Sequence, residues 1–248
     1  MLADFFYDIA TVCGRDFLVL KRRLVKFILS RMVAPILYLV AFGWGLGRNI
    51  DASGGYMDFL VPGLLALNSM NISFNGAVPV HAERIYHKSL EEYIMSPMNP
   101  TAFVIGKIFG GAARGLISSA VLLLLAFIFG ANVNLTLFAA LALFVNCLLF
   151  SALGFFAAMK IDTYEEMGQV NTYILLPMSF LCGTFFSVNA LPAGISAVIS
   201  LLPLTQTSVI LREAMTSGEI MFLPCVILLI YLIFCFYIAK KSFLDLVE

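Results

Sequence analysis

Residue types that usually carry catalysis are few in this chain, and their spacing fits no known catalytic arrangement. The two histidines, His81 and His87, do not form an H-E-x-x-H pattern, and no G-x-S-x-G nucleophile motif occurs. Gly106-Lys107 looks like the end of a phosphate-binding loop, but the preceding glycine and the following serine or threonine are absent. We therefore expect that the chain is not an enzyme and does not hydrolyse ATP itself.

The five cysteines also fail to form a chemical site. They lie far apart, they include no C-x-x-C pair, and four of them fall in apolar runs. This pattern is typical of small buried apolar side chains and not of disulfides or metal ligands. The sequence therefore predicts no metal and no cofactor bound by these residues, which are Cys13, Cys147, Cys182, Cys225 and Cys235.

Two cations, Lys107 and Arg114, lie inside a long apolar segment. Seven residues separate them, so they share one face of a helix, and Arg114 lies roughly 10 Å deeper than Lys107. A cation at such a depth costs about 2.5 to 3.5 kcal/mol unless it reaches the interface or is paired. Lys107 can reach the interface, whereas Arg114 needs a partner or a water-filled cavity. We expect Arg114 to form an ion pair with a carboxylate, and the candidates are Glu83, Asp162, Glu165 and Glu166.

Three asparagines, Asn68, Asn71 and Asn75, recur at helical spacing and therefore share one face. Amides in hydrocarbon are costly unless they are hydrogen-bonded, so this face should meet another helix or a polar pathway. The same two interpretations remain open for Asn171, Thr172 and Ser179.

The amino-acid composition indicates which class of fold holds the polar and charged residues described above. Of 248 residues, 61% are hydrophobic and 12% are charged, about half the charged share of a soluble domain. This excludes a soluble globular enzyme. Continuous apolar runs such as Leu122 to Phe129 do not alternate as strands of a transmembrane barrel would. The net charge of zero gives no reason to expect a nucleic-acid partner.

The charge-free stretches predict an all-α membrane protein with six transmembrane helices. Each helix needs about 20 apolar residues to cross a bilayer core of ~30 Å. The segment from Gly130 to Asn134 reads as a turn that divides one double-length stretch. The predicted spans are Phe27 to Gly47, Phe59 to Val80, Phe103 to Phe129, Leu135 to Met159, Met167 to Phe186 and Met221 to Ala239.

A shorter apolar segment, Asn189 to Leu202, precedes the last span and is framed by Pro192 and Pro203. It is too short to cross a bilayer, and non-helical backbone at membrane depth must be covered by protein or water. We therefore expect an extracytoplasmic re-entrant hairpin at this position.

Lysine and arginine near the span ends predict sidedness, because these residues are retained in the cytoplasm. They gather before the first span, after the second, after the fourth and after the sixth, whereas the opposite loops hold only Arg48 and Arg212. Both termini should therefore be cytoplasmic. The cations on the cytoplasmic side are Arg15, Lys21, Arg22, Arg23, Lys26, Arg31, Arg84, Lys88, Lys160, Lys240 and Lys241.

Two cytoplasmic segments have amphipathic helical periodicity. Residues Met1 to Lys26 fit an interfacial helix in the plane of the membrane. Residues Glu83 to Met95 fit a second helix, which Pro97 should end near Met95. A plain membrane anchor for the first helix and a solvated loop helix for the second remain alternatives.

Several motifs, taken in order, resemble the ABC type-2 exporter permeases, and most closely the nodulation-factor, drug and polysaccharide export group. They are Tyr56 to Gly63, Ser89-Leu-Glu-Glu92 with Ser96-Pro97, Gly110 to Gly115, and Leu191-Pro192 with Leu202 to Thr205. The resemblance spans nearly the whole chain. One departure is Lys88-Ser89, where many family members carry Gly-Thr.

The resemblance implies a homodimeric permease that two copies of a separate ABC ATPase subunit drive, with ATP and Mg bound by that partner. The coupling interface would then include Glu83, Arg84, Leu90, Glu91 and Glu92, and the pathway would include Asn68, Asn71, Asn75 and Ser179. The implied setting is the inner membrane of a prokaryote, with export of an amphipathic substrate such as a drug, lipid, lipo-oligosaccharide or glycan.

One domain, 1–248, accommodates all these features. Its expected parts are the surface helix 1–26, spans one and two 27–80, the coupling loop 81–100, spans three to five 101–186, the re-entrant segment 187–219, and the last span with a cytoplasmic tail 220–248.

Two other functions stay open. A secondary transporter would need an intramembrane titrating group, and the two longest charge-free stretches contain no carboxylate, which disfavours a proton-driven carrier. A non-transporting membrane assembly factor would explain the amphipathic helices and the glycines equally well.

Overall fold

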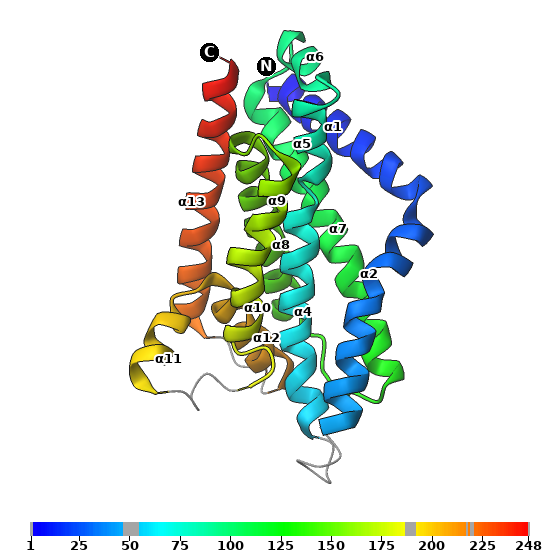
Figure 1. Cartoon of the computed structure of the whole chain (residues 1–248), viewed down its shortest axis with the longest axis vertical. Helices are drawn as coiled ribbons and strands as arrows, with labels where there is room; N and C mark the ends of the chain where they lie inside the picture. The colour runs from blue at the N-terminus through cyan, green and yellow to red at the C-terminus, as the bar shows by residue number, and fades with distance from the viewer. Residues whose placement is uncertain (1, 47–54, 187–191, 217, 219–220, 248) are drawn as a thin grey trace.

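The computed structural model describes residues 2–46, 55–186, 192–216, 218 and 221–247. Within these ranges the chain forms helices and turns, arranged as one elongated bundle (Figure 1). In chain order the elements are α1 (Leu2–Arg22), α2 (Leu24–Tyr38), the π-helical η1 (Leu39–Leu46), α4 (Gly55–Asn75), α5 (Val78–Ile85), α6 (Ser89–Met95), α7 (Pro100–Ile128), α8 (Leu137–Lys160), α9 (Tyr164–Val170), the π-helical η2 (Asn171–Leu175), α10 (Leu176–Leu181), α11 (Ala193–Ser200), α12 (Pro203–Thr216) and α13 (Phe222–Val247).

Helix α4 is the centre of the bundle and packs against α7, α8 and α12, while α13 packs along α8. Apolar side chains such as Leu60, Leu64 and Phe74 are fully buried along α4. Both termini lie at the same end of the bundle as α6, and α11 lies at the opposite end (Figure 1). This placement agrees with the expectation that the two termini share one side of the membrane.

Side-chain caps explain where several helices begin. Asn99 accepts a hydrogen bond from the backbone N–H of Thr101 at the start of α7, and Pro100 follows at a position that needs no donor. Thr136 caps α8 in the same way. The predicted turn between these helices is confirmed, and Gly130 adopts the left-handed conformation there, with a φ of 89°.

Four helical segments are long and apolar enough to cross a membrane: Leu24–Gly43, Pro100–Ile128, Leu137–Lys160 and Phe222–Leu246. They match the predicted first, third, fourth and sixth spans. Helix α4 falls outside this set because its amides and Asp58 make it less apolar, and the predicted fifth span is divided among α9, η2 and α10. The count of six spans therefore stays a prediction.

The predicted re-entrant segment is helical on both sides of a sharp bend. Residues Gly194–Ser200 and Pro203–Thr216 meet at 86°, a geometry that fits either a broken span or a re-entrant loop. Pro203 is the first residue of α12, where a backbone N–H would have no acceptor within the helix, so the missing N–H of proline costs nothing there. The hydroxyl of Thr205 donates to the carbonyl of Ile199 across the bend at 2.7 Å. Asn189, the expected start of the hairpin, lies outside the described residues.

Both predicted surface helices differ from expectation in their bounds. The first ends at Arg22, because the chain turns at Arg23 before α2 begins at Leu24, so it does not reach Lys26. The segment 83–95 is not one helix. Helix α5 ends at Ile85, and Lys88 adopts a left-handed φ of 51° before α6 begins. The predicted end at Met95 is confirmed, and Ser96 is extended before Pro97.

The glycines of α7 allow two other sets of helices to approach closely. An added Cβ at Gly106 would lie 2.7 Å from the Cβ of Val12 in α1. On the other side, a Cβ at Gly111 would collide with Ser151 of α8, and one at Gly115 would collide with Ser73 of α4. The segment from Gly106 to Gly115 contains two overlapping small-x-x-x-small patterns, which predict close approach of helices, and these contacts confirm that prediction.

Replacement of Gly154 by alanine should destabilise the bundle by about 1 to 3 kcal/mol, because the added Cβ would collide with the backbone carbonyl of Phe74 in α4. Thermal unfolding of the detergent-solubilised protein measures this loss. Gly168→Ala is the matched control, since Gly168 in α9 has nothing within 4 Å of its added Cβ. If Gly154→Ala and the wild type unfolded with the same midpoint temperature, the close contact between α4 and α8 would be contradicted.

Candidate functional site

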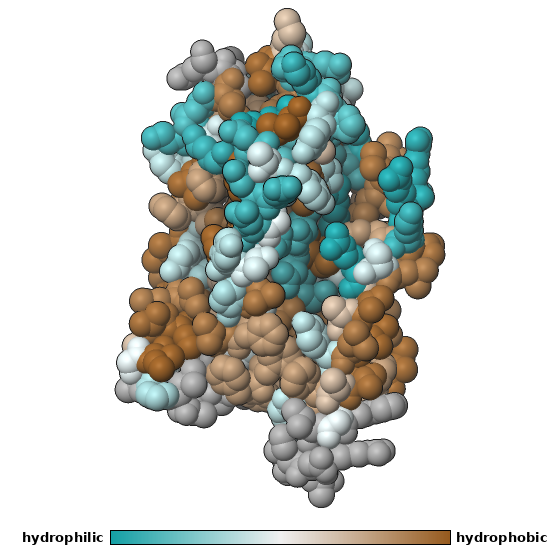
Figure 2. All heavy atoms as spheres, in the orientation of Figure 1, coloured by the Kyte–Doolittle hydropathy of each residue, from teal (hydrophilic) through white to brown (hydrophobic). Residues whose placement is uncertain are grey.

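Hydrophilic residues gather at the end of the bundle that carries α1 and α6. Figure 2 shows hydrophilic side chains over this end, with a strip that continues toward the middle of the face, and hydrophobic side chains over the opposite half. Because a bilayer covers apolar surface, the hydrophilic end is the part of the chain that a water-soluble partner can reach. The charged candidates from the sequence lie here.

Helix α1 is attached to the start of α7 along much of its length. The carboxylate of Asp8 accepts a hydrogen bond from the backbone N–H of Asn99 at 3.1 Å. Further along, Val12 is buried against Gly106. The Cys13 thiol donates to the Gly106 carbonyl at 3.4 Å, and burial together with the nearby Asp16 carboxylate raises the pKa of that thiol. The helix is therefore docked on the bundle and not only on the membrane surface.

Four charged side chains from three helices form an ion cluster, called here the buried ion cluster after its central Lys107. Its members are Arg15 and Asp16 of α1, Glu83 of α5 and Lys107 of α7, and Arg15 lies at its exposed edge. The Lys107 ammonium lies 3.0 Å from the Glu83 carboxylate and 3.2 Å from the Asp16 carboxylate. Arg15 lies 2.7 Å from the second Glu83 oxygen. Glu83 thus links α1 to α7 through α5.

Aromatic rings extend this cluster to α6. The guanidinium of Arg15 lies 5.2 Å from the ring centre of Tyr93, and the Lys107 ammonium lies 5.8 Å from the same ring. The ring of Phe103, which packs against that of Tyr93, lies 5.6 Å from the same ammonium. Cations attract the negative faces of such rings, so Tyr93 holds α6 against the cluster.

The cluster has two positive and two negative charges, so it is neutral as a unit. The side chain of Lys107 is only 1% exposed, so partners within the protein stabilise its charge and not contact with water. Its charge is tolerated because two carboxylates and two rings replace water around it. Removal of one partner from a buried ion pair typically costs 3–5 kcal/mol, since the remaining charge stays buried.

Arg84, the second coupling candidate on α5, faces a different neighbour. It donates to the carbonyls of Ala158 and Ile161 at the end of α8 and lies 2.7 Å from the Asp162 carboxylate. Glu83 and Arg84 thus both bind partners within the chain. Neither lies on the outer face of a single coupling helix. They join α5 to α1, α7 and the α8–α9 turn.

Helix α6 presents the remaining coupling candidates. Leu90 is 4% exposed and packs into the core, so it anchors the helix. Glu91 and Glu92 are exposed, as is Met95 at the end of the helix. Helix α6 lies at the end of the bundle that also carries both termini (Figure 1), and these three side chains are open to solvent there.

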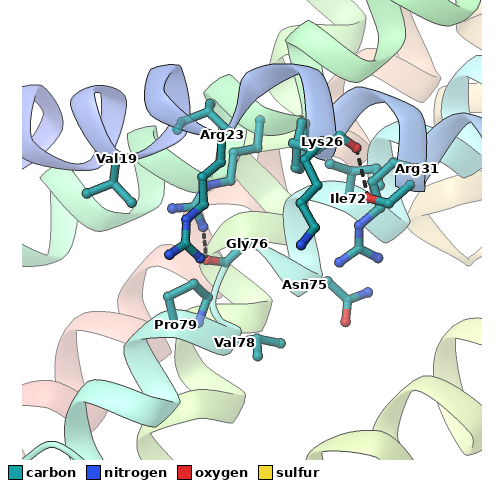
Figure 3. A pocket seen from close by; sticks show the side chains of 13 residues that line it. Val19, Arg23, Lys26, Arg31, Ile72, Asn75, Gly76, Val78 and Pro79 are labelled. Atoms are coloured by element: carbon teal, nitrogen blue, oxygen red, sulfur yellow. Dashed lines mark hydrogen bonds between the residues drawn. The ribbon is translucent and has the colours of Figure 1, made fainter.

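The expected ion pair of Arg114 is not formed within the described residues. Arg114 donates instead to the carbonyl of Gly76 at 2.7 Å, where α4 ends. Of its four candidate carboxylates, Glu83 pairs with Lys107 and Arg15, and Asp162 pairs with Arg84. Arg114 also borders a cavity of about 300 Å³. This cavity lies between the α1–α2 junction and the end of α4 (Figure 3).

The asparagine face of α4 meets neighbouring helices, as one of the two interpretations predicted, and it also borders a cavity. Asn68 donates to Ser118 of α7 at 2.9 Å, and the amides of Asn75 and Asn171 bond each other at 3.1 and 3.3 Å. Asn68, Asn71 and Asn75 also border a cavity of about 260 Å³ beside α2. Ser179 does not border it and donates to the carbonyl of Leu176 in its own helix.

Two features were not anticipated. Asp16 continues the inward helical series of Ile9, Val12 and Leu20, so its spacing could have placed it on the buried face. The fully buried Asn146 receives a hydrogen bond from Thr207 and donates one to Ser69, joining α8 to α12 and α4. No local signal identifies this second network, because its partners lie far apart in the sequence.

Comparison with known proteins agrees with this architecture. Residues 7–216 match the family described as "ABC-2 type transporter", a range that includes the ion cluster and α6. The inner membrane transport permease YadH of Escherichia coli (strain K12) is 27% identical over 177 residues, 68% of this chain and 69% of that protein. Nodulation protein J of Rhizobium meliloti (strain 1021) is 25% identical over 213 residues, 84% of this chain and 81% of that protein.

Proposed function

Because the chain belongs to the ABC-2 type transporter family, we propose that it is the transmembrane permease subunit of an ATP-binding-cassette exporter. Two copies form the translocation pathway, and each binds one copy of a separate ATPase subunit. That partner binds ATP and Mg and performs the hydrolysis. The permease contributes the membrane passage and the helices that receive the movement.

The buried ion cluster is the observation that carries this proposal. It joins the surface helix α1, the α5–α6 pair and the long helix α7 through charge pairs of 2.7 to 3.2 Å. Leu90 and Tyr93 pack α6 against the bundle and the ion cluster. A movement of α6 would therefore be passed to α7 through packed side chains and not through a flexible loop. Glu91 and Glu92 remain exposed to meet the ATPase.

The proposed mechanism is alternating access. ATP binding draws the two ATPase subunits together, each α6 moves with its subunit, and the seam between the two permease copies opens outward. Since the dimer is two-fold, each coupling residue acts twice.

The dimer proposal rests on two exposed apolar surfaces. Helix α2 leaves Leu29, Val33 and Leu37 more than half exposed, and the η2–α10 region leaves Tyr173 and Leu176 more than half exposed. Figure 1 shows these segments on either side of α4. They are the first and fifth predicted spans, and a two-fold contact through them would place the asparagine face of α4 beside the seam.

We propose an amphipathic substrate, because the cavity beside this face combines amides with leucines. The surrounding membrane is the prokaryotic inner membrane, with both termini in the cytoplasm. This location follows the permease relative and the distribution of lysine and arginine.

Reconstitution tests the proposal directly. The chain and the ABC ATPase co-purified with it are placed in proteoliposomes, and movement of a labelled amphipathic drug is followed with ATP and with a non-hydrolysable analogue. Transport should require the ATPase and hydrolysable ATP. Gradient-driven transport by the chain alone would identify a secondary transporter. Stable membrane insertion with neither an ATPase partner nor transport would favour an assembly factor.

A further inference from the structure

The cavity beside Arg114 is lined by several positively charged side chains. Its walls come from the end of α1, the start of α2, and the α4–α5 turn with Arg114 of α7. Figure 3 shows Arg23, Lys26 and Arg31 extending from the α1–α2 junction toward Asn75 and Pro79. With Arg114, four cations border about 300 Å³, and no carboxylate borders it.

These cations form no close ion pair within the described part of the chain, and Asp16 and Glu83 act on Arg114 only from a distance. Arg23, Lys26 and Arg31 form no ion pair there, in contrast to Lys107, which has two carboxylate partners. Among residues 2–46, 55–186, 192–216, 218 and 221–247, the carbonyl of Gly76 is the only hydrogen-bond acceptor of Arg114. Four like charges that converge on one space repel one another, so the site is suited to an anion that accepts several N–H donors.

A second cavity adjoins this one and shares part of its wall. Ser30, Arg31, Ile72 and Asn75 border both this cavity and the 260 Å³ cavity along α2 and α4. The second cavity extends past Pro35 to Leu64 and Leu122, which offer apolar surface. A phosphate at the cationic end would therefore have room for an acyl chain to lie between α2 and α4.

We propose that this cavity binds the phosphate headgroup of an anionic phospholipid from the leaflet on the α1 side of the bundle. Cationic pockets between membrane helices bind such headgroups. A lipid with a net negative charge fits better than a zwitterionic one, since the latter would bring its own cation into a site that already has four. The bound lipid fixes the α1–α2 junction to α4, and this role holds whether or not the chain transports lipid.

Native mass spectrometry of the full chain tests the proposal. The protein is equilibrated in detergent with phosphatidylglycerol or phosphatidylcholine, and retained lipid is counted. The wild type should retain phosphatidylglycerol preferentially. Arg23→Gln with Lys26→Gln should weaken phosphatidylglycerol binding by about 30-fold, if each cation contributes the usual increment for an anionic lipid surface.

The matched control is Lys21→Gln with Arg22→Gln. It removes the same charge from adjacent exposed positions that do not border the cavity, so its lipid retention should equal that of the wild type. Equal losses in both double variants would overturn the site, because they would show only general surface attraction. Displacement of the lipid by millimolar inorganic phosphate, or equal retention of both lipids, would overturn the assignment to an anionic phospholipid.

Discussion

Replacement of Lys107 by methionine is expected to lower the free energy of unfolding by about 3–5 kcal/mol. Methionine fills a similar volume but leaves the Asp16 and Glu83 carboxylates facing one another, with only Arg15 to balance them. Thermal and chemical unfolding of the protein in mixed micelles measures the loss. The ATPase activity stimulated by the permease should fall as well, because α1 and α5 would no longer be held to α7.

Lys160→Met is the matched control for this loss. Its ammonium lies 3.5 Å from Asp245, but the two side chains are 52% and 46% exposed. Exposed pairs of this kind contribute about 0–1 kcal/mol. A double variant, Lys107→Met with Glu83→Gln, restores charge balance between Arg15 and Asp16 and should recover part of the stability. Similar unfolding for Lys107→Met and Lys160→Met would disprove the importance of the buried ion cluster.

Reversal of charge at Glu91 and Glu92 to lysine should reduce association with the ATPase subunit by tenfold or more while leaving membrane insertion unchanged. Both side chains are exposed on α6, and neither forms an ion pair with another described residue. Two carboxylates at this surface are expected to meet cations of the ATPase subunit, so lysines there would face like charges. Such a pairing costs several kcal/mol and slows association. Co-purification and surface plasmon resonance with the partner subunit measure the effect.

The control for this prediction is Glu165→Lys with Glu166→Lys on α9, which reverses the same number of exposed carboxylates away from α6. Equal loss of binding in the control would show that overall charge matters and not the α6 surface. Leu90→Asp should behave differently from both, because Leu90 is buried. It should lower thermal stability and ATPase association together, since it would release α6 from the bundle.

Local composition determined the class of protein and several helix ends. Long apolar stretches must be helical in a membrane, and Pro97 and Gly130 stop helices through their own backbone constraints. The small-x-x-x-small pattern of α7 also predicted close packing, because a missing side chain removes steric exclusion whatever the partner is. These inferences needed no knowledge of which helices are neighbours.

Pairing of polar side chains was decided only by the tertiary structure. Lys107 and Asp16 are separated by 91 residues, and Lys107 and Glu83 by 24, so no spacing rule connects them. The expected carboxylate partner of Arg114 was wrong because Lys107 occupies Glu83 and Arg84 occupies Asp162. Likewise, the segment 83–95 is divided into two helices by the left-handed residue Lys88. Glu83 is paired with Lys107 inside the bundle, whereas α6 lies on the surface of the bundle. A sequence determines which residues need partners, whereas the packing of helices determines which partners lie within reach.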